Sequence, residues 1–214
     1  MIQAVIFDLD GVLTDTAHYH FQAWQALAHS LGIAFTEQDN EHLKGVDRLG
    51  SLRLILQKGG LTLPAAEEER LMARKNAHYL QLIAGMTAAD LFPGVRELFA
   101  RLKQSGIKLG LASASKNAAF VLQRLGIAGE FDAIADAATV KHSKPDPEIF
   151  LQAAALLQIA PEHCLGVEDA AAGVTAINRA GMRAIGIGQP EQLREALMVF
   201  PTLQALDAER LLTL

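Results

Sequence analysis

Residues 4–11 read Ala4-Val5-Ile6-Phe7-Asp8-Leu9-Asp10-Gly11. The first four form a short, continuous apolar run, which is typical of a strand buried on both faces of a parallel sheet. Two carboxylates follow directly, and the alternation of an extended chain places Asp8 and Asp10 on the same side. Functional groups of parallel α/β sheets collect beyond the carboxyl ends of the strands. This stretch therefore predicts a first strand and one edge of a site.

Further apolar runs alternate with helical patterns along the rest of the chain. The runs cover Leu109–Ala112, Ala133–Ala135, Cys164–Val167 and Ala184–Ile187. The helical patterns cover Val95–Ser105, Ala118–Leu125, Pro147–Leu157 and Ala170–Ala180. This alternation predicts the α/β class, with a Rossmann-like parallel sheet, right-handed crossovers and helices on both faces.

One long region, 15–90, interrupts the alternation. It has helical patterning and no convincing strand: His18–Leu31 is amphipathic and ends at Gly32, and Ala65–Ile83 is a second long helix. We therefore expect an inserted α-helical cap domain at 15–90. The core domain would then consist of 1–14 and 91–214.

Composition and charge limit the class of protein and its partners. The formal net charge is -5, and no stripe of Lys and Arg is present to neutralise phosphates of a nucleic acid. The single cysteine, Cys164, excludes an internal disulfide and has apolar neighbours, as a buried structural thiol would. No signal-peptide pattern or apolar run of roughly 18 residues appears. We expect a cytoplasmic monomer without nucleic-acid or membrane partners.

Four strand ends carry polar residues that could form one site. They are Asp8 with Asp10, the stretch Ser113-Ala114-Ser115, Lys144 in its loop, and Glu168-Asp169. Gathered carboxylates repel one another and raise each other's pKa, and a hard cation relieves this. An all-oxygen site suits Mg²⁺, so we expect metal ligands at Asp8, Asp10, Glu168 and Asp169. Taken alone, Asp169 is better explained as the N-cap of the following helix, and it is the set of four acids that favours a metal.

The same residues favour phosphoryl transfer. A carboxylate such as Asp8 can accept a phosphoryl group as an acyl phosphate, and Asp10 can shuttle a proton to and from the reacting oxygen. Lys144 would offset phosphate charge, and Ser113 with the amides around Ala114 would donate hydrogen bonds. Considered singly, the serines could be loop caps and Lys144 a solvated side chain.

These residues resemble the motifs of the haloacid dehalogenase superfamily of phosphotransferases, and within it the chain is similar to the β-phosphoglucomutases. The similar stretches are 7–17 with His20, Ala23 and Trp24, then 42–48, 74–76, 111–117, 143–145 and 166–169. The resemblance implies a magnesium-dependent isomerase that acts on glucose phosphates. Phospho-Asp8 and a β-glucose 1,6-bisphosphate would be the intermediates between β-D-glucose 1-phosphate and D-glucose 6-phosphate.

The resemblance also implies roles in the cap. Thr16 and His20, one helical turn apart, would hydrogen-bond with Asp10 and couple cap closure to catalysis. Lys44, Arg48, Ser51 and Lys75 would reach a distal phosphate. The full set of implied substrate contacts is Asp10, Trp24, Leu43, Lys44, Gly45, Val46, Asp47, Arg48, Ser51, Lys75, Ser113, Ala114, Ser115, Lys116, Asn117 and Lys144. Trp24 could either stack on a sugar or pack inside the cap.

Two other functions share parts of this pattern. A sugar-phosphate phosphatase has the same core motifs and differs in the cap. A phospho-receiver signalling module also places acids, a Ser or Thr and a lysine around Mg²⁺, but it lacks a long helical insertion. The residues of the predicted cap therefore distinguish a mutase from a phosphatase and from a phospho-receiver module.

Overall fold

The computed structural model describes residues 1–43, 46–206 and 208–212. It separates into two compact units, which we call the core (Met1–Asp15 with Met86–Leu214) and the cap (Thr16–Gly85). The sequence pattern assigns 15 and 86–90 to the cap, whereas in the structure these residues group with the core. The Thr14 hydroxyl donates to the Asp90 carbonyl at 2.7 Å, and the Phe92 amide donates to the Leu13 carbonyl at 2.9 Å. These bonds fasten that segment to the core.

The core is built on a parallel sheet with the strand order β3-β2-β1-β4-β5-β6. The strands are β1 (Ala4–Phe7), β2 (Lys108–Leu111), β3 (Ala133–Ile134), β4 (Cys164–Glu168), β5 (Arg183–Ile187) and β6 (Met198–Phe200). Phe7, the last residue of β1, is in register with Leu111 of β2 and Val167 of β4. The polar residues that follow these strands therefore emerge at one edge. The predicted α/β class is confirmed.

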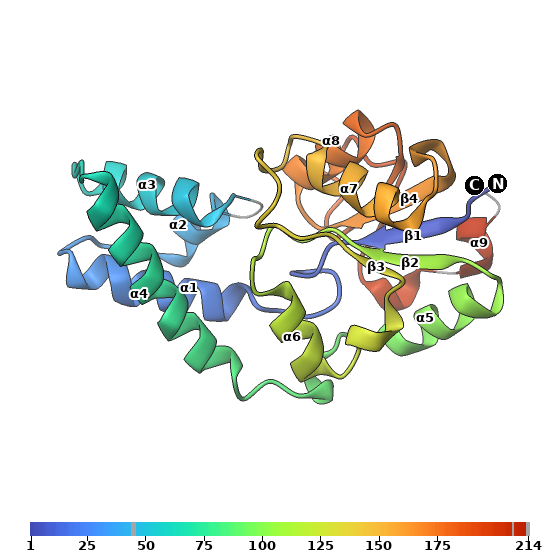
Figure 1. The fold of residues 1–214 in the computed structure, drawn as a ribbon, viewed down its shortest axis with the longest axis horizontal. Helices are drawn as coiled ribbons and strands as arrows, with labels where there is room; N and C mark the ends of the chain where they lie inside the picture. The colour runs from blue at the N-terminus through green and yellow to red at the C-terminus, as the bar shows by residue number, and fades with distance from the viewer. Residues whose placement is uncertain (44–45, 207, 213–214) are drawn as a thin grey trace. The chain divides into compact units, whose positions relative to one another are not determined.

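Helices cover both faces of this sheet. In the core they are α5 (Val95–Gln104), α6 (Ala118–Leu125), α7 (Glu148–Leu157), α8 (Ala171–Arg179) and α9 (Ala208–Leu212). Short 3-10 turns lie at η1 (Ala88–Asp90), η2 (Ala128–Glu130), η3 (Pro161–His163) and η4 (Leu203–Ala205). Figure 1 shows α7 and α8 on one side of the sheet and α5 and α9 on the other. Phe150 and Ile177 from α7 and α8 pack in the core against Ile6 of β1.

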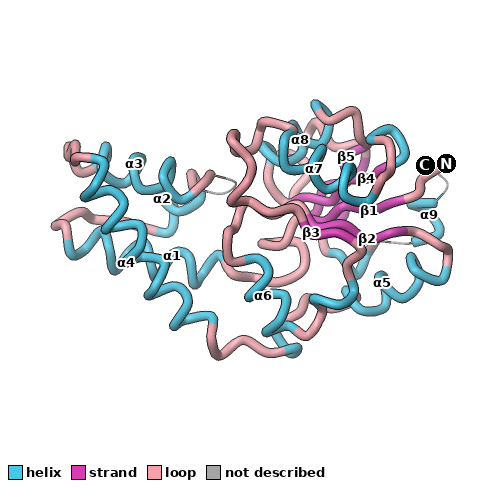
Figure 2. The backbone as a smooth tube through the Cα atoms, in the orientation of Figure 1, coloured by secondary structure: helices cyan, strands magenta, loops and turns pink. Residues whose placement is uncertain are grey.

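The cap consists of helices and loops in its described residues, as Figure 2 shows. Its helices are α1 (Ala17–Ser30), α2 (Glu37–Glu41), α3 (Arg48–Lys58) and α4 (Ala65–Ile83). Trp24 and Leu27 of α1, Leu52 and Ile55 of α3 and Leu71 of α4 form its apolar centre. The apolar stripes of α1 and α4 thus bury each other, which is why the cap is a compact unit of its own.

Side-chain hydrogen bonds stabilise the N-termini of α2 and α3. Thr36 and Asp39 form a reciprocal capping box at the start of α2, and Lys58 from the end of α3 donates to Asp39 at 2.5 Å. Asp47 accepts from the Gly50 amide at 2.8 Å and so caps α3. Among the described residues, no helix combines the length and apolar character needed to cross a bilayer.

Candidate active site

A buried lysine joins two of the predicted acids at the carboxyl edge of the sheet. Lys144 Nζ donates to Asp8 Oδ1 at 2.8 Å and to Glu168 Oε1 at 2.6 Å. The side chains of Lys144 and Glu168 are each 2% exposed and that of Asp8 is 9% exposed. Phe150 of α7 supports the ammonium group, with 5.0 Å between Nζ and the ring centre. Three strand-end residues predicted from the sequence are therefore in direct contact.

Burial and the neighbouring charges shift the pKa values of Asp8 and Lys144, and for each residue burial is opposed by its oppositely charged partners. Burial raises the pKa of Asp8 to about 7, and repulsion from Glu168 and Asp10 adds to it, while Lys144 lowers it. Burial alone would lower the pKa of Lys144, but Asp8 and Glu168 outweigh it and raise that pKa above its usual value. The ammonium group of Lys144 is therefore a permanent positive charge beside Asp8.

The oxygens around Asp8 fit a divalent metal. Carboxylate oxygens of Asp8, Glu168 and Asp169 lie within 4.8 Å of one another. Asp169 lies against Gly11, whose positive φ of 79° suits glycine, and a Cβ at that position would overlap the Asp169 carboxylate. Such an all-oxygen set is what hard cations prefer. Asp10 is partly exposed and stands beside this group in sequence, and its place as a ligand stays a prediction.

Glu168 already has two partners within the protein. One oxygen accepts from Lys144, and the other accepts from the Ala170 amide at 2.8 Å, just before α8. Gly173 of α8 approaches so closely that a Cβ there would overlap Oε1 of Glu168. Glu168 therefore holds Lys144 in place. A role of Glu168 as a metal ligand stays a prediction.

The loop after β2 carries the predicted phosphate contacts Ser113 to Asn117. Ser113 is 1% exposed, and its hydroxyl accepts from the Ser115 amide at 3.1 Å. The Ser115 hydroxyl in turn accepts from the amide of Asn117, the residue before α6, at 3.3 Å. Ala114 is partly exposed and Lys116 is exposed. The serines therefore shape the loop, as loop caps would, and their predicted contact with phosphate stays a prediction.

In the cap, His20 of α1 meets Lys75 of α4. Lys75 Nζ lies 2.8 Å from His20 Nδ1, and the His20 ring stacks on Tyr79 with 4.1 Å between centres. Burial lowers the pKa of His20 well below its usual value, and the charges of Lys75 and Arg48 lower it further. A neutral His20 accepts through Nδ1 and so carries its proton on Nε2. Thr16, fully buried, lies one turn before it, and its carbonyl accepts from the His20 amide at 3.0 Å.

The predicted recognition tract lies around the start of α3. Arg48 begins that helix and is partly exposed, while Ser51 is buried and its hydroxyl reaches the Val46 carbonyl at 3.5 Å. Leu43 packs in the apolar centre of the cap. Lys44 and Gly45 lie outside the described residues.

Other cap side chains have structural partners. Arg53 pairs with Glu68 at 2.9 Å, and Lys58 pairs with Asp39. Trp24 is 3% exposed and faces Lys75, whose Nζ lies 4.6 Å from its ring centre. Packing inside the cap accounts for this position, and a sugar contact by Trp24 stays a prediction.

A comparison with family models identifies the family of this chain. Residues 2–181 match the model of the haloacid dehalogenase-like hydrolases. The chain belongs to the haloacid dehalogenase-like hydrolase family. The resemblance inferred from the strand-end motifs is therefore confirmed.

Individual relatives in this family extend over nearly the whole chain. A β-phosphoglucomutase from Bacillus subtilis is 48% identical over 212 residues, which is 98% of this chain and 94% of the relative. A crystal structure of β-phosphoglucomutase from Clostridium difficile superposes with a TM-score of 0.97 at 46% identity, covering 100% of this chain and 96% of the other. A phosphorylated carbohydrates phosphatase from Thermotoga maritima is 33% identical over 86% of this chain and 84% of its own. Similarity to both enzyme classes is thus present.

Three residues that shape the site in this family member were not predicted from the sequence. Gly173 permits the approach of α8 to Glu168, Phe150 underlies Lys144, and Tyr79 stacks on His20. A glycine inside a helical pattern is the only sequence signal among them, because such a residue indicates close packing. The other two are apolar or aromatic positions that look like ordinary core residues.

Proposed function

We propose that this haloacid dehalogenase-like enzyme is a β-phosphoglucomutase, an isomerase that interconverts β-D-glucose 1-phosphate and D-glucose 6-phosphate. The observation that carries the proposal is the 48% identity to the Bacillus subtilis β-phosphoglucomutase over 98% of this chain. That match covers the cap as well as the core. Similarity restricted to the strand-end motifs would have left the acceptor open.

In the proposed reaction, Asp8 carries the phosphoryl group. The bond between phosphorus and the Asp8 carboxylate breaks as a new bond forms to the free hydroxyl of the glucose phosphate, and Asp10 takes the hydroxyl proton. The sugar bisphosphate then returns its other phosphoryl group to Asp8, and Asp10 gives the proton back. Lys144, already 2.8 Å from Asp8, offsets the charge that develops during both transfers.

A divalent metal, which we propose is Mg²⁺, would be held by oxygens of Asp8, Asp10 and Asp169 and would keep Asp8 ionised while screening phosphate charge. Oxygens of Asp8 and Asp169 lie within 4.8 Å of each other and support this part of the proposal, whereas the place of Asp10 rests on the resemblance. Glu168 contributes indirectly, since its bond at 2.6 Å fixes Lys144.

The proposed role of the cap is to favour sugar over water as the acceptor. His20, neutral and bonded to Lys75 through Nδ1, has an N–H left at Nε2 to donate. Arg48, and Lys44 by resemblance, are proposed to bind the second phosphate, because a planar guanidinium can hold phosphate in bidentate fashion. Exclusion of water would protect the aspartyl phosphate from hydrolysis.

A sugar-phosphate phosphatase is the second candidate, and the Thermotoga maritima relative favours it. The proposal further includes a monomer that acts in the cytoplasm without nucleic acid, and of these parts only the location and the absence of nucleic acid follow from sequence composition and patterns. Incubation with β-glucose 1-phosphate, Mg²⁺ and a catalytic amount of the bisphosphate separates the two enzymes. Glucose 6-phosphate is the expected product. Stoichiometric release of free phosphate without glucose 6-phosphate would show that the enzyme is a phosphatase and contradict the mutase proposal.

A further inference from the structure

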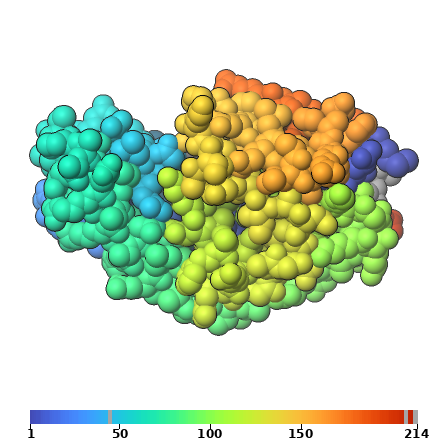
Figure 3. Space-filling view, viewed as in Figure 1, coloured from blue at the N-terminus to red at the C-terminus, as the bar shows by residue number. Residues whose placement is uncertain are grey.

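The loop that presents Lys144 runs from β3 to α7 across the surface of the core. Residues 140–157, yellow to orange in Figure 3, reach the surface on the face shown. The Lys144 side chain nevertheless points into the protein and is 2% exposed. Its bonds to Asp8 at 2.8 Å and to Glu168 at 2.6 Å both depend on where the loop backbone places Lys144.

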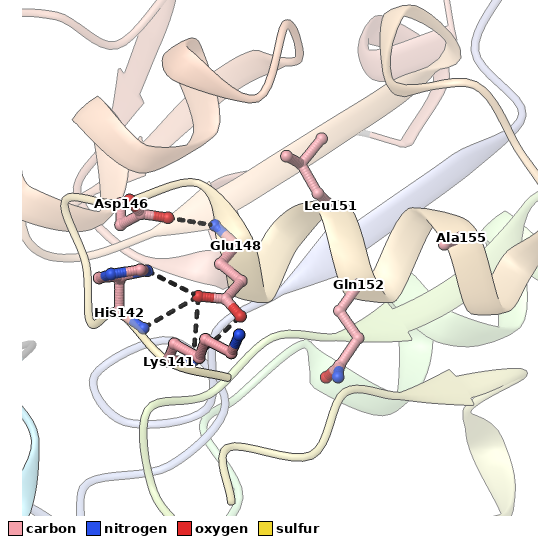
Figure 4. A pocket seen from close by; sticks show the side chains of 7 residues that line it. All are labelled: Lys141, His142, Asp146, Glu148, Leu151, Gln152 and Ala155. Atoms are coloured by element: carbon pink, nitrogen blue, oxygen red, sulfur yellow. Dashed lines mark hydrogen bonds and ion pairs between the residues drawn. The ribbon is translucent and has the colours of Figure 1, made fainter. Parts of the chain in front are cut away.

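Glu148, in the first turn of α7, holds the loop just before Lys144. Its Oε1 accepts from the Lys141 amide at 2.9 Å, and its Oε2 accepts from the His142 amide at 2.9 Å. His142 Nδ1 lies 3.2 Å from the same Oε2. Figure 4 shows these contacts converging on one carboxylate. A single side chain thus closes the loop that contains Lys144.

Gln152 adds a second point of attachment one turn further along α7. Its Oε1 accepts from the Asp136 amide at 2.9 Å, and its Nε2 donates to the Thr139 hydroxyl at 2.7 Å. Residues four apart share one face of a helix, and Figure 4 shows both side chains leaving α7 on the side of the loop. One helix face therefore holds the backbone at two successive places ahead of Lys144. We call Glu148 and Gln152 together the clasp.

Two further hydrogen bonds hold the part of the loop that lies between Lys144 and α7. Asp146 Oδ1 accepts from the Glu148 amide at 3.0 Å, and Arg179 of α8 donates to the Pro145 carbonyl at 3.2 Å. The contact with Arg179 links the loop to the helix that follows Glu168. The loop is thus attached before and after Lys144 by side chains that do not touch Asp8 in the described bonds.

A metal site is the alternative role for part of this cluster. Ligand atoms of His142, Asp146 and Glu148 lie within 4.8 Å of one another. Each carboxylate already accepts from backbone amides, however, and these bonds lower the pKa of Glu148, the largest effect coming from the Lys141 amide. The local bonds account for the cluster without an ion.

We propose that Glu148 and Gln152 are positioning residues that hold the loop so that Lys144 stays between Asp8 and Glu168. The inference rests on the proposed role of Lys144 in phosphoryl transfer and extends it to the exposed face of α7. Neither residue contacts the reacting groups, so their effect on catalysis passes through Lys144.

The first experiment compares variants that differ only in the clasp. Glu148→Ala is expected to lower kcat by about 10- to 100-fold with KM changed by less than about 2-fold, because a catalytic group displaced by about 1 Å loses that much. Glu148→Gln keeps an oxygen for one amide and should lose less. Glu97→Ala removes an exposed carboxylate from the first turn of α5 and is the matched control, expected to retain kcat within about 2-fold. Equal activities of Glu148→Ala and Glu97→Ala would overturn the inference.

A double-variant cycle shows whether Glu148 acts through Lys144. In single-turnover transfer from the sugar bisphosphate, Glu148→Ala should change the rate by less than about 2-fold once Lys144 is already alanine. If the rate loss of the double variant equals the product of the losses of Glu148→Ala and Lys144→Ala, Glu148 acts independently of Lys144, which contradicts the inference. If Lys144→Ala itself keeps wild-type activity, the proposed role of Lys144 fails independently of Glu148.

A chemical measurement covers the case in which the double variant is too slow. Lys144, buried and paired, should react slowly with an amine-modifying reagent, as read by mass spectrometry of its peptide. Glu148→Ala and Gln152→Ala should speed that labelling, and Glu97→Ala should not. Unchanged labelling of Lys144 in both clasp variants, with the fold intact by circular dichroism, would refute the positioning role.

Discussion

Lys144 is central to the site, because its single ammonium group pairs with two buried carboxylates at once. Replacing it with alanine leaves Asp8 and Glu168 facing each other without a cation. We expect Lys144→Ala to lower kcat by about 10²- to 10³-fold and the free energy of unfolding by about 3–5 kcal/mol in metal-free buffer. Added Mg²⁺ should restore part of the stability, since a ligand of the folded state alone stabilises it. Lys141→Ala, exposed and in the same loop, is the control for thermal denaturation and activity.

His20 predicts a pH dependence of stability. It is held neutral in the folded cap because burial lowers its pKa well below 6.5, whereas in the unfolded chain it takes up a proton below that pH. The unfolded state therefore binds more protons, and the free energy of unfolding should fall as the pH drops below about 6.5, by at most ~1.4 kcal/mol per pH unit. His20→Gln should remove this component from urea denaturation curves between about pH 7 and pH 5.

His29→Gln, at the exposed end of the same helix, is the control variant for this measurement. If His20→Gln and His29→Gln give the same slope as the wild type, His20 is not held neutral by the fold. The measurement concerns the cap itself and is independent of activity.

Residues with their own chemistry were predictable, and residues that act through shape were not. The contact of Lys144 with Asp8 and Glu168 could be anticipated, because acids and a lysine together at strand ends are typical of a phosphoryl-transfer site. Glu148 was missed because its partners are backbone amides six and seven positions earlier, and that distance depends on the path of a loop. Trp24 was ambiguous because an aromatic residue on an amphipathic helix fits both packing and binding.

At the level of elements, the approach of α8 to β4 sets the position of Glu168. Gly173 lies so near Oε1 of Glu168 that a methyl group would overlap it. Alanine favours a helix by up to about 1 kcal/mol over glycine, but overpacking costs about 1–3 kcal/mol. We expect Gly173→Ala to lower both the melting temperature and kcat, because the displaced Glu168 carboxylate no longer holds Lys144. Gly129→Ala, where nothing lies within 4 Å, is the matched control. A Gly173→Ala variant with higher stability and full activity would contradict this packing.

Element prediction succeeded where burial left a clear pattern. β1, α4 and α6 have the predicted bounds, because continuous apolar runs and long amphipathic repeats follow directly from their surroundings. β6 was not predicted: it spans Met198–Phe200, is half-exposed, and pairs only with β5 among the described strands. A three-residue edge strand carries too little alternation to be recognised without its neighbour.

On the scale of the whole molecule, the cap should decide which acceptor is used. Arg48 is partly buried at the start of α3, and burial lowers its pKa without removing its charge. We expect Arg48→Ala to lower kcat/KM for β-glucose 1-phosphate on the order of 100-fold, as loss of a charge-assisted phosphate contact would. Hydrolysis of a small aryl phosphate should stay within about 2-fold. Arg53→Ala, whose partner is Glu68, is the control in both assays. If Arg48→Ala lowers kcat/KM equally for β-glucose 1-phosphate and for the aryl phosphate, Arg48 of the cap does not recognise the sugar phosphate.

The division into two units was predicted only roughly. The long helical insertion was evident from the lack of apolar runs, but its end lies at Gly85 and not at residue 90. The hydrogen bonds of Thr14 with Asp90 and of Leu13 with Phe92 connect residues far apart in sequence. A hydropathy pattern does not contain such a connection, so the boundary required the structure.

The central claim is that Asp8 passes its phosphoryl group to a sugar. The most direct test loads the enzyme with an isotope-labelled phosphoryl group, confirms by mass spectrometry that it resides on the peptide containing Asp8, and adds unlabelled β-glucose 1-phosphate with Mg²⁺ for a single turnover. We predict that the label appears in the sugar bisphosphate and then in glucose 6-phosphate, and that Asp8→Asn takes up no label. Label released as inorganic phosphate, with none in the sugar, would contradict the account.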